Sequence, residues 1–156
     1  MGNGIAQVAA GAGFDVILLD INDAALEKGL AALSKSLDRL IKKESITSEQ
    51  KAQTLARIKT TTLYTDLASV SLVIEAATEN QAIKEKILAQ VDQVVSKETI
   101  IASNTSSISI THLGSLNSRP ERFIGIHFFN PPPLMTLLEV IMGKQTSPET
   151  LKTVLA

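Results

Sequence analysis

The chain has 156 residues, of which 44% are hydrophobic and 20% charged, which suits one globular domain with a sizeable core. Its net charge of −1 argues against nucleic-acid binding, which needs a concentrated basic face, and no apolar run approaches the roughly 20 residues that span a bilayer. Cysteine is absent, which excludes disulfides, thiolate metal sites and a cysteine nucleophile. No signal peptide is visible. We therefore expect a soluble, cytoplasmic protein.

Short apolar runs alternate with longer segments of helical periodicity along the chain. The first half predicts a helix over residues 1–13, a buried strand over 15–20, a helix from Asn22 or Asp23 to about Lys43, and a helix from about Thr47. Further strands are expected at 59–63, 71–76, 99–102, 123–127 and 137–141, and further helices at 81–95, 108–113 and from Ser147. The alternation predicts an α/β fold with a doubly wound, mostly parallel sheet in one domain, 1–156.

The stretch from Ile124 to Ile141, IGIHFFNPPPLMTLLEVI, places one histidine and one glutamate in two apolar runs joined by a proline-rich turn. Either group alone is costly to bury, whereas an imidazole held by a carboxylate is the usual construction of a general base. A strand–turn–strand return would bring Glu139 under the ring of His127, so the first hypothesis is a His127–Glu139 dyad. The alternative is a core histidine bonded to a backbone carbonyl, with Glu139 solvated at a strand end.

The N-terminal glycines suggest a dinucleotide-binding turn. In that motif a strand leads into G-x-G-x-x-G, and an acid about 20 residues later binds the ribose hydroxyls. Gly2 is placed as the last glycine and Asp20 as the acid, which favours NAD over NADP because a 2′-phosphate would lie against the carboxylate. The alternatives are close packing of helix on sheet for Gly2 and a helix-capping turn for Asp20.

Four segments together resemble the NAD-binding domain of the 3-hydroxyacyl-CoA dehydrogenases: GNGIAQVAAGAGFDVILLD, VIEAATEN, ASNTSS and GIHFFNPPPLMTLLEVI. The resemblance covers essentially the whole chain and is closest to the bacterial 3-hydroxybutyryl-CoA type. It implies NAD-dependent oxidation of (S)-3-hydroxyacyl-CoA to 3-ketoacyl-CoA, and the reverse, in fatty acid or butanoate metabolism. The family also has a first strand upstream and a helical domain downstream that forms most of its homodimer contact.

Without that first strand the Rossmann-like sheet would have two interior strand edges unpaired, and unpaired buried backbone groups are costly. We therefore expect the 156-residue chain alone to be marginally stable, to bind NAD poorly and to be inactive.

The resemblance implies roles for four residues near the reaction. His127 matches the histidine that takes the proton of the 3-hydroxyl, and Glu139 matches the carboxylate that orients the imidazole. Ser106 matches a serine that contacts substrate and cofactor, and Asn130 matches an asparagine near the nicotinamide and the substrate carbonyl. The alternatives are a simple helix cap for Ser106 and an Asn-Pro turn for Asn130.

The resemblance also implies binding residues for NAD and CoA. Asp20 matches the acid on the adenosine ribose, and Glu79 and Lys84 match positions that line the NAD groove, with solvated side chains at a helix start as the alternative. Ser36 and Lys43 match the family's CoA contacts. The cations Lys35, Arg39 and Lys42 recur on one helix face beside Lys43, where they suit phosphate charges or are simply solvated.

Two other functions remain open on the sequence alone. One is a non-catalytic NAD- or CoA-binding protein, because a fold does not fix a function. The other is an oxidoreductase that acts on a free hydroxy acid without CoA. His112 is interpreted as an ordinary surface histidine, and no metal site is predicted because two histidines without an acid cluster do not make one.

Overall fold

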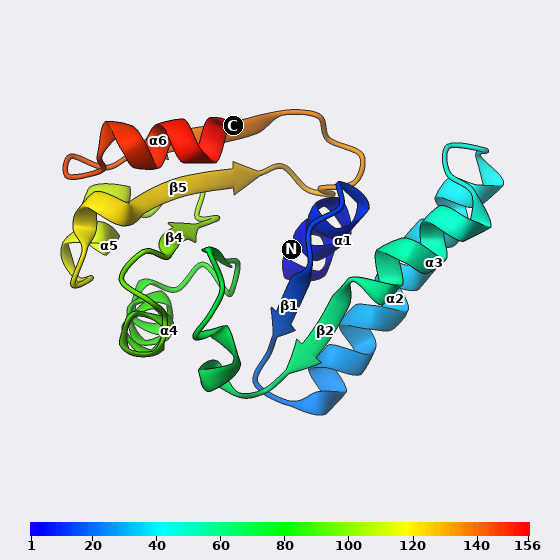
Figure 1. Cartoon of the computed structure of the whole chain (residues 1–156), viewed down its shortest axis with the longest axis horizontal. Helices are drawn as coiled ribbons and strands as arrows, with labels where there is room; N and C mark the ends of the chain where they lie inside the picture. Colours follow the sequence, from blue (N-terminus) through cyan, green and yellow to red (C-terminus); the bar gives the residue numbers. More distant parts are fainter. The chain divides into compact units, whose positions relative to one another are not determined.

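The computed structural model describes all 156 residues and divides them into two compact units, each of which contains its own sheet (Figure 1). The first unit comprises Met1–Asp66 and Asn130–Met135, and the second comprises Leu67–Phe129 and Thr136–Ala156. None of the helices combines the length and the hydrophobicity that a membrane span requires.

The first unit contains three helices and a two-stranded parallel sheet. Its elements are α1 (Gly2–Gly11), β1 (Val16–Leu19), α2 (Asp23–Lys42), α3 (Ser48–Ala56) and β2 (Ile58–Thr61). Leu33 and Leu37 of α2 are buried with Ala6 of α1, and side chains of β1 and β2 pack against them. The face of α2 that carries Leu33 and Leu37 therefore covers this sheet, as in an amphipathic helix.

Side-chain caps set where α2 and α3 begin. The Oδ1 of Asn22 accepts the N–H of Ala25 at 2.9 Å. At α3, the hydroxyl of Thr47 accepts the N–H of Gln50 at 3.1 Å, and the Gln50 side chain accepts the N–H of Thr47 at 2.8 Å. These bonds satisfy amide groups that have no acceptor within the first helical turn, which confirms the predicted starts of both helices.

The segment Asn130–Met135 belongs to the first unit and rests on α1. A Cβ added to Gly4 would lie 2.9 Å from Cδ of Pro132, closer than real Cβ contacts occur. Gly4 is therefore required by a close approach and not by an unusual backbone angle. The peptide bond between Asn130 and Pro131 is cis.

The second unit is built on a four-stranded sheet in the order β3-β4-β5-β6. Its main elements are β3 (Leu72–Glu75), α4 (Gln81–Val94), β4 (Ile100–Ser103), α5 (Ile110–Ser115), β5 (Phe123–Phe128), β6 (Leu138–Met142) and α6 (Pro148–Leu155). Short 3-10 helices at Tyr64–Leu67 and Pro120–Arg122 were not predicted. The first three strands of the sheet run parallel, and β6 runs antiparallel to β5.

The core of the second unit lies on the two central strands. Ile100 and Ala102 of β4 are buried against Ile124 and Ile126 of β5, and apolar side chains of α6 pack on them. All four residues of β4 are buried, as a short apolar run flanked by helices predicts. The predicted α/β class with a mostly parallel sheet is confirmed. The assignment of residues 1–156 to one domain stays a prediction.

Candidate active site

His127 on β5 and Glu139 on β6 are direct partners across the antiparallel ladder. The Nδ1 of His127 lies 2.8 Å from Oε2 of Glu139. Direct partners in such a ladder have Cβ atoms about 5 Å apart, so the register of the two strands is what brings the side chains together. The histidine side chain is 16% exposed and the glutamate side chain 51% exposed. His127 thus contacts a carboxylate and not a backbone carbonyl.

This hydrogen bond selects one tautomer of the imidazole. A carboxylate only accepts, so in the neutral ring the proton lies on Nδ1 and the lone pair on Nε2. The tautomer is assigned from this bond. Nε2 makes no hydrogen bond within the protein, and the ring of Phe129 flanks the imidazole at 4.7 Å between centroids. The pair is therefore built to accept a proton at Nε2 and to stabilise the charged ring that results.

The loop after β4 presents the hydroxyl of Ser106. Thr105 is buried, whereas Ser106 is exposed and its hydroxyl makes no hydrogen bond within the protein. The cap of α5 is Ser109, whose hydroxyl accepts the N–H of His112 at 3.2 Å, so the alternative of Ser106 as a helix cap is wrong. Asn104 joins the loop to β5, because its Oδ1 accepts the N–H of Phe128 at 2.7 Å.

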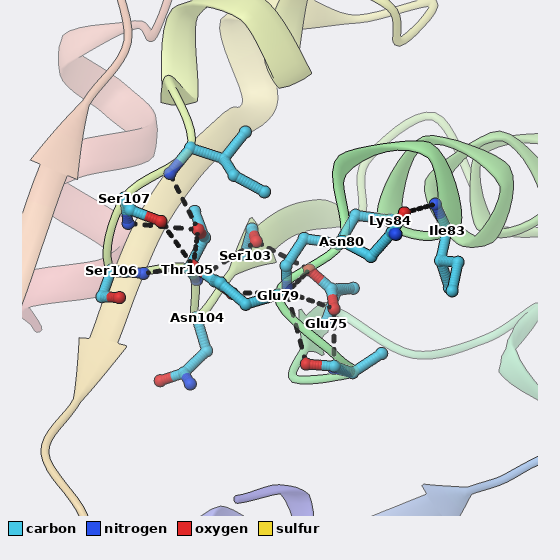
Figure 2. Close-up of polar contacts among 12 residues, drawn as sticks. Glu75, Glu79, Asn80, Ile83, Lys84, Ser103, Asn104, Thr105, Ser106 and Ser107 are labelled. Carbon is cyan, nitrogen blue, oxygen red and sulfur yellow. Dashed lines mark hydrogen bonds and ion pairs between the residues drawn. The ribbon is translucent and has the colours of Figure 1, made fainter.

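Glu79 holds this loop through one carboxylate oxygen (Figure 2). Its Oε1 accepts the hydroxyl of Thr105, the N–H of Ser106 at 3.0 Å and the hydroxyl of Ser107 at 3.1 Å. Burial raises the pKa of Glu79, but these hydrogen bonds and the charge of Lys84 outweigh it and lower the pKa from 4.5 to about 2. Glu79 is therefore ionised at neutral pH and is fixed in place.

Lys84 is buried against Glu75, with both side chains 1% exposed. Its Nζ lies 2.9 and 3.0 Å from the two carboxylate oxygens of Glu75 and 3.4 Å from Oε2 of Glu79. Glu75 also accepts the N–H of Ala77 and the hydroxyl of Ser103, each at 2.7 Å. Glu75 was not among the predicted site residues, although a carboxylate within a buried strand requires partners, and that requirement was the available signal.

The remaining predicted site residues belong to the first unit. A Cβ at Gly2 would meet no atom within 4 Å, and Asp20 is exposed at the end of β1, with its carboxylate accepting the N–H of Ile21 at 2.7 Å. Asn130 is exposed and Ser36 is half-buried. Four cations in the C-terminal half of α2 and at its C-cap are exposed and make no ion pair: Lys35, Arg39, Lys42 and Lys43. The grouping of these residues with the dyad in one site stays a prediction.

His112 lies on the surface, as the sequence analysis expects. Its Nε2 is 3.0 Å from Oε1 of Glu85 and 3.0 Å from the side-chain nitrogen of Gln81. The His112 side chain is 45% exposed. The two histidines of the chain therefore differ, since only His127 contacts a carboxylate across a sheet ladder.

Residues 1–156 match the family described as 3-hydroxyacyl-CoA dehydrogenase, NAD binding domain. The chain belongs to this family. The match confirms the resemblance to this family. It also confirms the predicted cofactor, NAD, because the family is an NAD-binding domain.

Known proteins of this kind are similar along nearly the whole chain. The 3-hydroxybutyryl-CoA dehydrogenase of Bradyrhizobium diazoefficiens is 49% identical over 150 residues, which cover 96% of the chain and 51% of that protein. The fatty acid oxidation complex subunit alpha of Acinetobacter baylyi is 46% identical over 153 residues, which cover 98% of the chain and 21% of that protein.

Two solved structures are similar to the chain over nearly its whole length. The crystal structure of (S)-3-hydroxybutyryl-CoA dehydrogenase from Ralstonia eutropha has a TM-score of 0.97 and 58% identity, and the match covers 99% of the chain and 54% of that protein. The 3-hydroxybutyryl-CoA dehydrogenase from Escherichia coli has a TM-score of 0.95 and 40% identity over 99% of the chain and 33% of that protein. The chain thus spans 51% to 55% of the first two curated relatives that it matches.

Proposed function

We propose that the full-length protein oxidises a short-chain (S)-3-hydroxyacyl-CoA, such as 3-hydroxybutyryl-CoA, to the 3-ketoacyl-CoA with NAD, and catalyses the reverse reaction. The observation that carries the proposal is the 2.8 Å hydrogen bond from Nδ1 of His127 to Oε2 of Glu139 in a chain of this NAD-binding family. The relatives named 3-hydroxybutyryl-CoA dehydrogenase support the substrate class.

In the oxidation, Nε2 of His127 accepts the proton of the 3-hydroxyl group. Bound NAD would supply the hydride acceptor for C3, and NADH the hydride donor for the reverse reaction. Glu139 faces the Nδ1–H of the same ring, so its negative charge stabilises the imidazolium as it forms. In the reduction, the imidazolium gives the same proton back to the oxygen. The exposed hydroxyl of Ser106 and the amide of Asn130 are proposed to orient substrate and cofactor.

The residues assigned to NAD have chemistry that fits it. Asp20 offers an exposed carboxylate at the end of a parallel strand, which suits the ribose hydroxyls. Gly2 leaves open space at the first turn of α1, where the N–H groups of Gly2 and Asn3 have no acceptor in the protein and attract phosphate. Glu79, whose side chain is 42% exposed, completes the proposed cofactor set, and the buried Lys84 belongs to it through its contact with Glu79.

The CoA part of the substrate is proposed to bind at α2. Lys43 and Ser36 are the assigned contacts, and the neighbouring cations of that helix have no carboxylate partner in the protein. They are therefore free to face the phosphate groups of CoA. We further propose that the full-length protein is a cytoplasmic homodimer that dimerises through its C-terminal domain.

Kinetics of the purified full-length protein test the proposal. Acetoacetyl-CoA should be reduced with NADH and much more slowly with NADPH, and His127→Ala should abolish turnover while the surface control His112→Ala retains it. NADH binding without turnover of any substrate would favour a non-catalytic binding protein. Equal turnover of acetoacetate and its CoA thioester would favour an oxidoreductase of free hydroxy acids.

A further inference from the structure

We propose that Glu75 is a positioning residue for the proposed reaction: together with Lys84 it fixes the loop that carries Ser106 and joins that loop to the strand of His127. The inference rests on the proposed function and assigns a role to a buried group that the dyad mechanism does not use. Figure 2 shows the residues concerned, which come from β3, from α4 with the turn before it, and from the end of β4 with the loop after it.

A gain in stability does not by itself explain the buried ion pair between Glu75 and Lys84. Removing two charges from water costs several kcal/mol per ion, and well-packed apolar replacements of buried pairs are often neutral or stabilising. Glu75 and Lys84 are each 1% exposed, so neither charge is solvated. An ion pair that is so completely buried is better explained by the geometry that it imposes on neighbouring residues.

One path of contacts runs from Glu75 through Lys84 to the loop. The ammonium group lies between the carboxylate of Glu75 and Oε2 of Glu79, at 2.9 and 3.4 Å. The other oxygen of Glu79 accepts the N–H of Ser106, together with the hydroxyl groups on either side of it. The backbone of Ser106 is thereby fixed while its hydroxyl remains free. Lys84 is enclosed by these protein groups, so it acts through Glu79.

A second path runs from Glu75 directly into the loop and then to β5. The hydroxyl of Ser103 donates to Oε2 of Glu75 at 2.7 Å, and the N–H of Asn104 donates to the main-chain carbonyl of Glu75 at 2.8 Å. The side chain of Asn104 accepts the N–H of Phe128, the residue after His127, at 2.7 Å. Glu75 thus contacts the loop that holds Ser106 and, through Asn104, the strand that holds the dyad.

The test is a mutant cycle in the full-length enzyme. The pair variant Glu75→Gln/Lys84→Met removes both charges and retains similar volumes, so it avoids leaving one charge buried alone. Its effect on kcat is measured with Ser106 present and again in Ser106→Ala. We expect a loss of about tenfold or more in the first background and less than about twofold in the second, because residues that act as a unit are not additive.

A matched control uses the other buried ion pair of α4. Arg119 and Asp92 lie 2.8 Å apart with side chains 8% and 15% exposed, and neither contacts the loop after β4. Asp92→Asn/Arg119→Met should lower stability but leave kcat unchanged. Amide hydrogen exchange at Ser106 should accelerate in the pair variant and not in the control.

The outcomes separate the inference from the proposed function. An equal loss of kcat in both backgrounds, or no loss in the pair variant, would overturn the positioning role while wild-type turnover still supports the function. Absence of wild-type turnover would remove both. If the pair variant does not fold, Ser103→Ala carries the same test, because it removes the hydroxyl that donates to Glu75 and accepts the N–H of Thr105 in the loop. We then expect a severalfold loss of kcat that disappears in Ser106→Ala, and an unchanged kcat would overturn the role.

Discussion

Glu139 lies directly opposite His127 in the β5–β6 ladder, with its Oε2 2.8 Å from Nδ1 of the imidazole. Because side chains alternate between the two faces of a strand, a slip of one residue would carry Glu139 to the opposite face of the sheet. Strand register therefore holds the geometry of the dyad. For the dyad itself, the proline-rich connection between the strands only has to return the chain.

The first prediction concerns the charge of Glu139. Glu139→Gln retains the size of the side chain but removes the charge that stabilises the imidazolium. We expect kcat for acetoacetyl-CoA reduction by the full-length protein to fall by about 10²- to 10⁴-fold. Glu139→Asp keeps the charge but shortens the reach, and should give an intermediate loss. Glu149→Gln, an exposed carboxylate at the start of α6, is the control and should retain activity. Near-normal turnover in Glu139→Gln would remove the dyad from the mechanism.

Local signals in the sequence were sufficient for most elements and for the pairing of His127 with Glu139. The starts of α2 and α3 are set by hydrogen bonds of Asn22, Thr47 and Gln50 that span only three residues. Such short-range capping patterns can be recognised in the sequence. His127 and Glu139 could be singled out because each is an ionisable residue within an otherwise apolar segment.

The hydrogen bonds that hold the loop of Ser106 could not be predicted from such local patterns. Glu75 meets Ser103 across 28 residues, and Asn104 meets Phe128 across 24, by contacts that exist only once parallel strands align their carboxyl ends. Ser109 could not be preferred over Ser106 as the cap of α5 from residue type, because both are serines that precede the same short helix. Side chains joined across strands need the sheet register before they can be paired.

The second prediction concerns the contact between Gly4 and Pro132. Alanine in a helix gains about 1 kcal/mol over glycine, but at Gly4 its Cβ would lie 2.9 Å from a rigid proline ring, and such overpacking costs about 1–3 kcal/mol. Gly29 in α2 is the matched control, because its Cβ would meet ordinary contacts at 3.8 Å or more. We expect Gly29→Ala to raise Tm and Gly4→Ala to lower it. Gly4→Ala should also lower kcat, because the displaced segment begins with Asn130; a higher Tm in both variants would contradict the contact.

The third prediction concerns CoA recognition by α2. Lys43→Glu should raise KM for acetoacetyl-CoA by about 2- to 10-fold at low ionic strength and leave kcat unchanged, because an exposed charge in water acts weakly and is screened by salt. The effect should shrink as salt is added. Lys97→Glu makes the same change in net charge at an exposed position after α4 and should leave KM unchanged. Equal increases in both variants would point to net charge in general and not to a CoA site.

The fourth prediction uses the low pKa of Glu79. Hydrogen bonds from the loop lower this pKa from 4.5 to about 2 in the folded protein, so folding favours the ionised carboxylate. The resulting stability is fully present above pH 4.5 and is lost as the pH falls from there towards 2. Glu79→Gln cannot titrate. The difference in Tm between wild type and this variant should therefore be largest near neutral pH and should shrink steadily in acid.

The size of this difference should stay modest, because the Glu79 side chain is 42% exposed and solvent screens its interactions. Thermal unfolding of the full-length protein between neutral and acidic pH measures it. Glu27→Gln on α2 removes an exposed carboxylate that makes no hydrogen bond or ion pair within the protein, and its Tm difference from wild type should not change with pH in the same way. If the difference in Tm between wild type and Glu79→Gln is constant across this pH range, Glu79 is not held by its hydrogen bonds to the loop. In that case the path from Lys84 to Ser106 would have no electrostatic support.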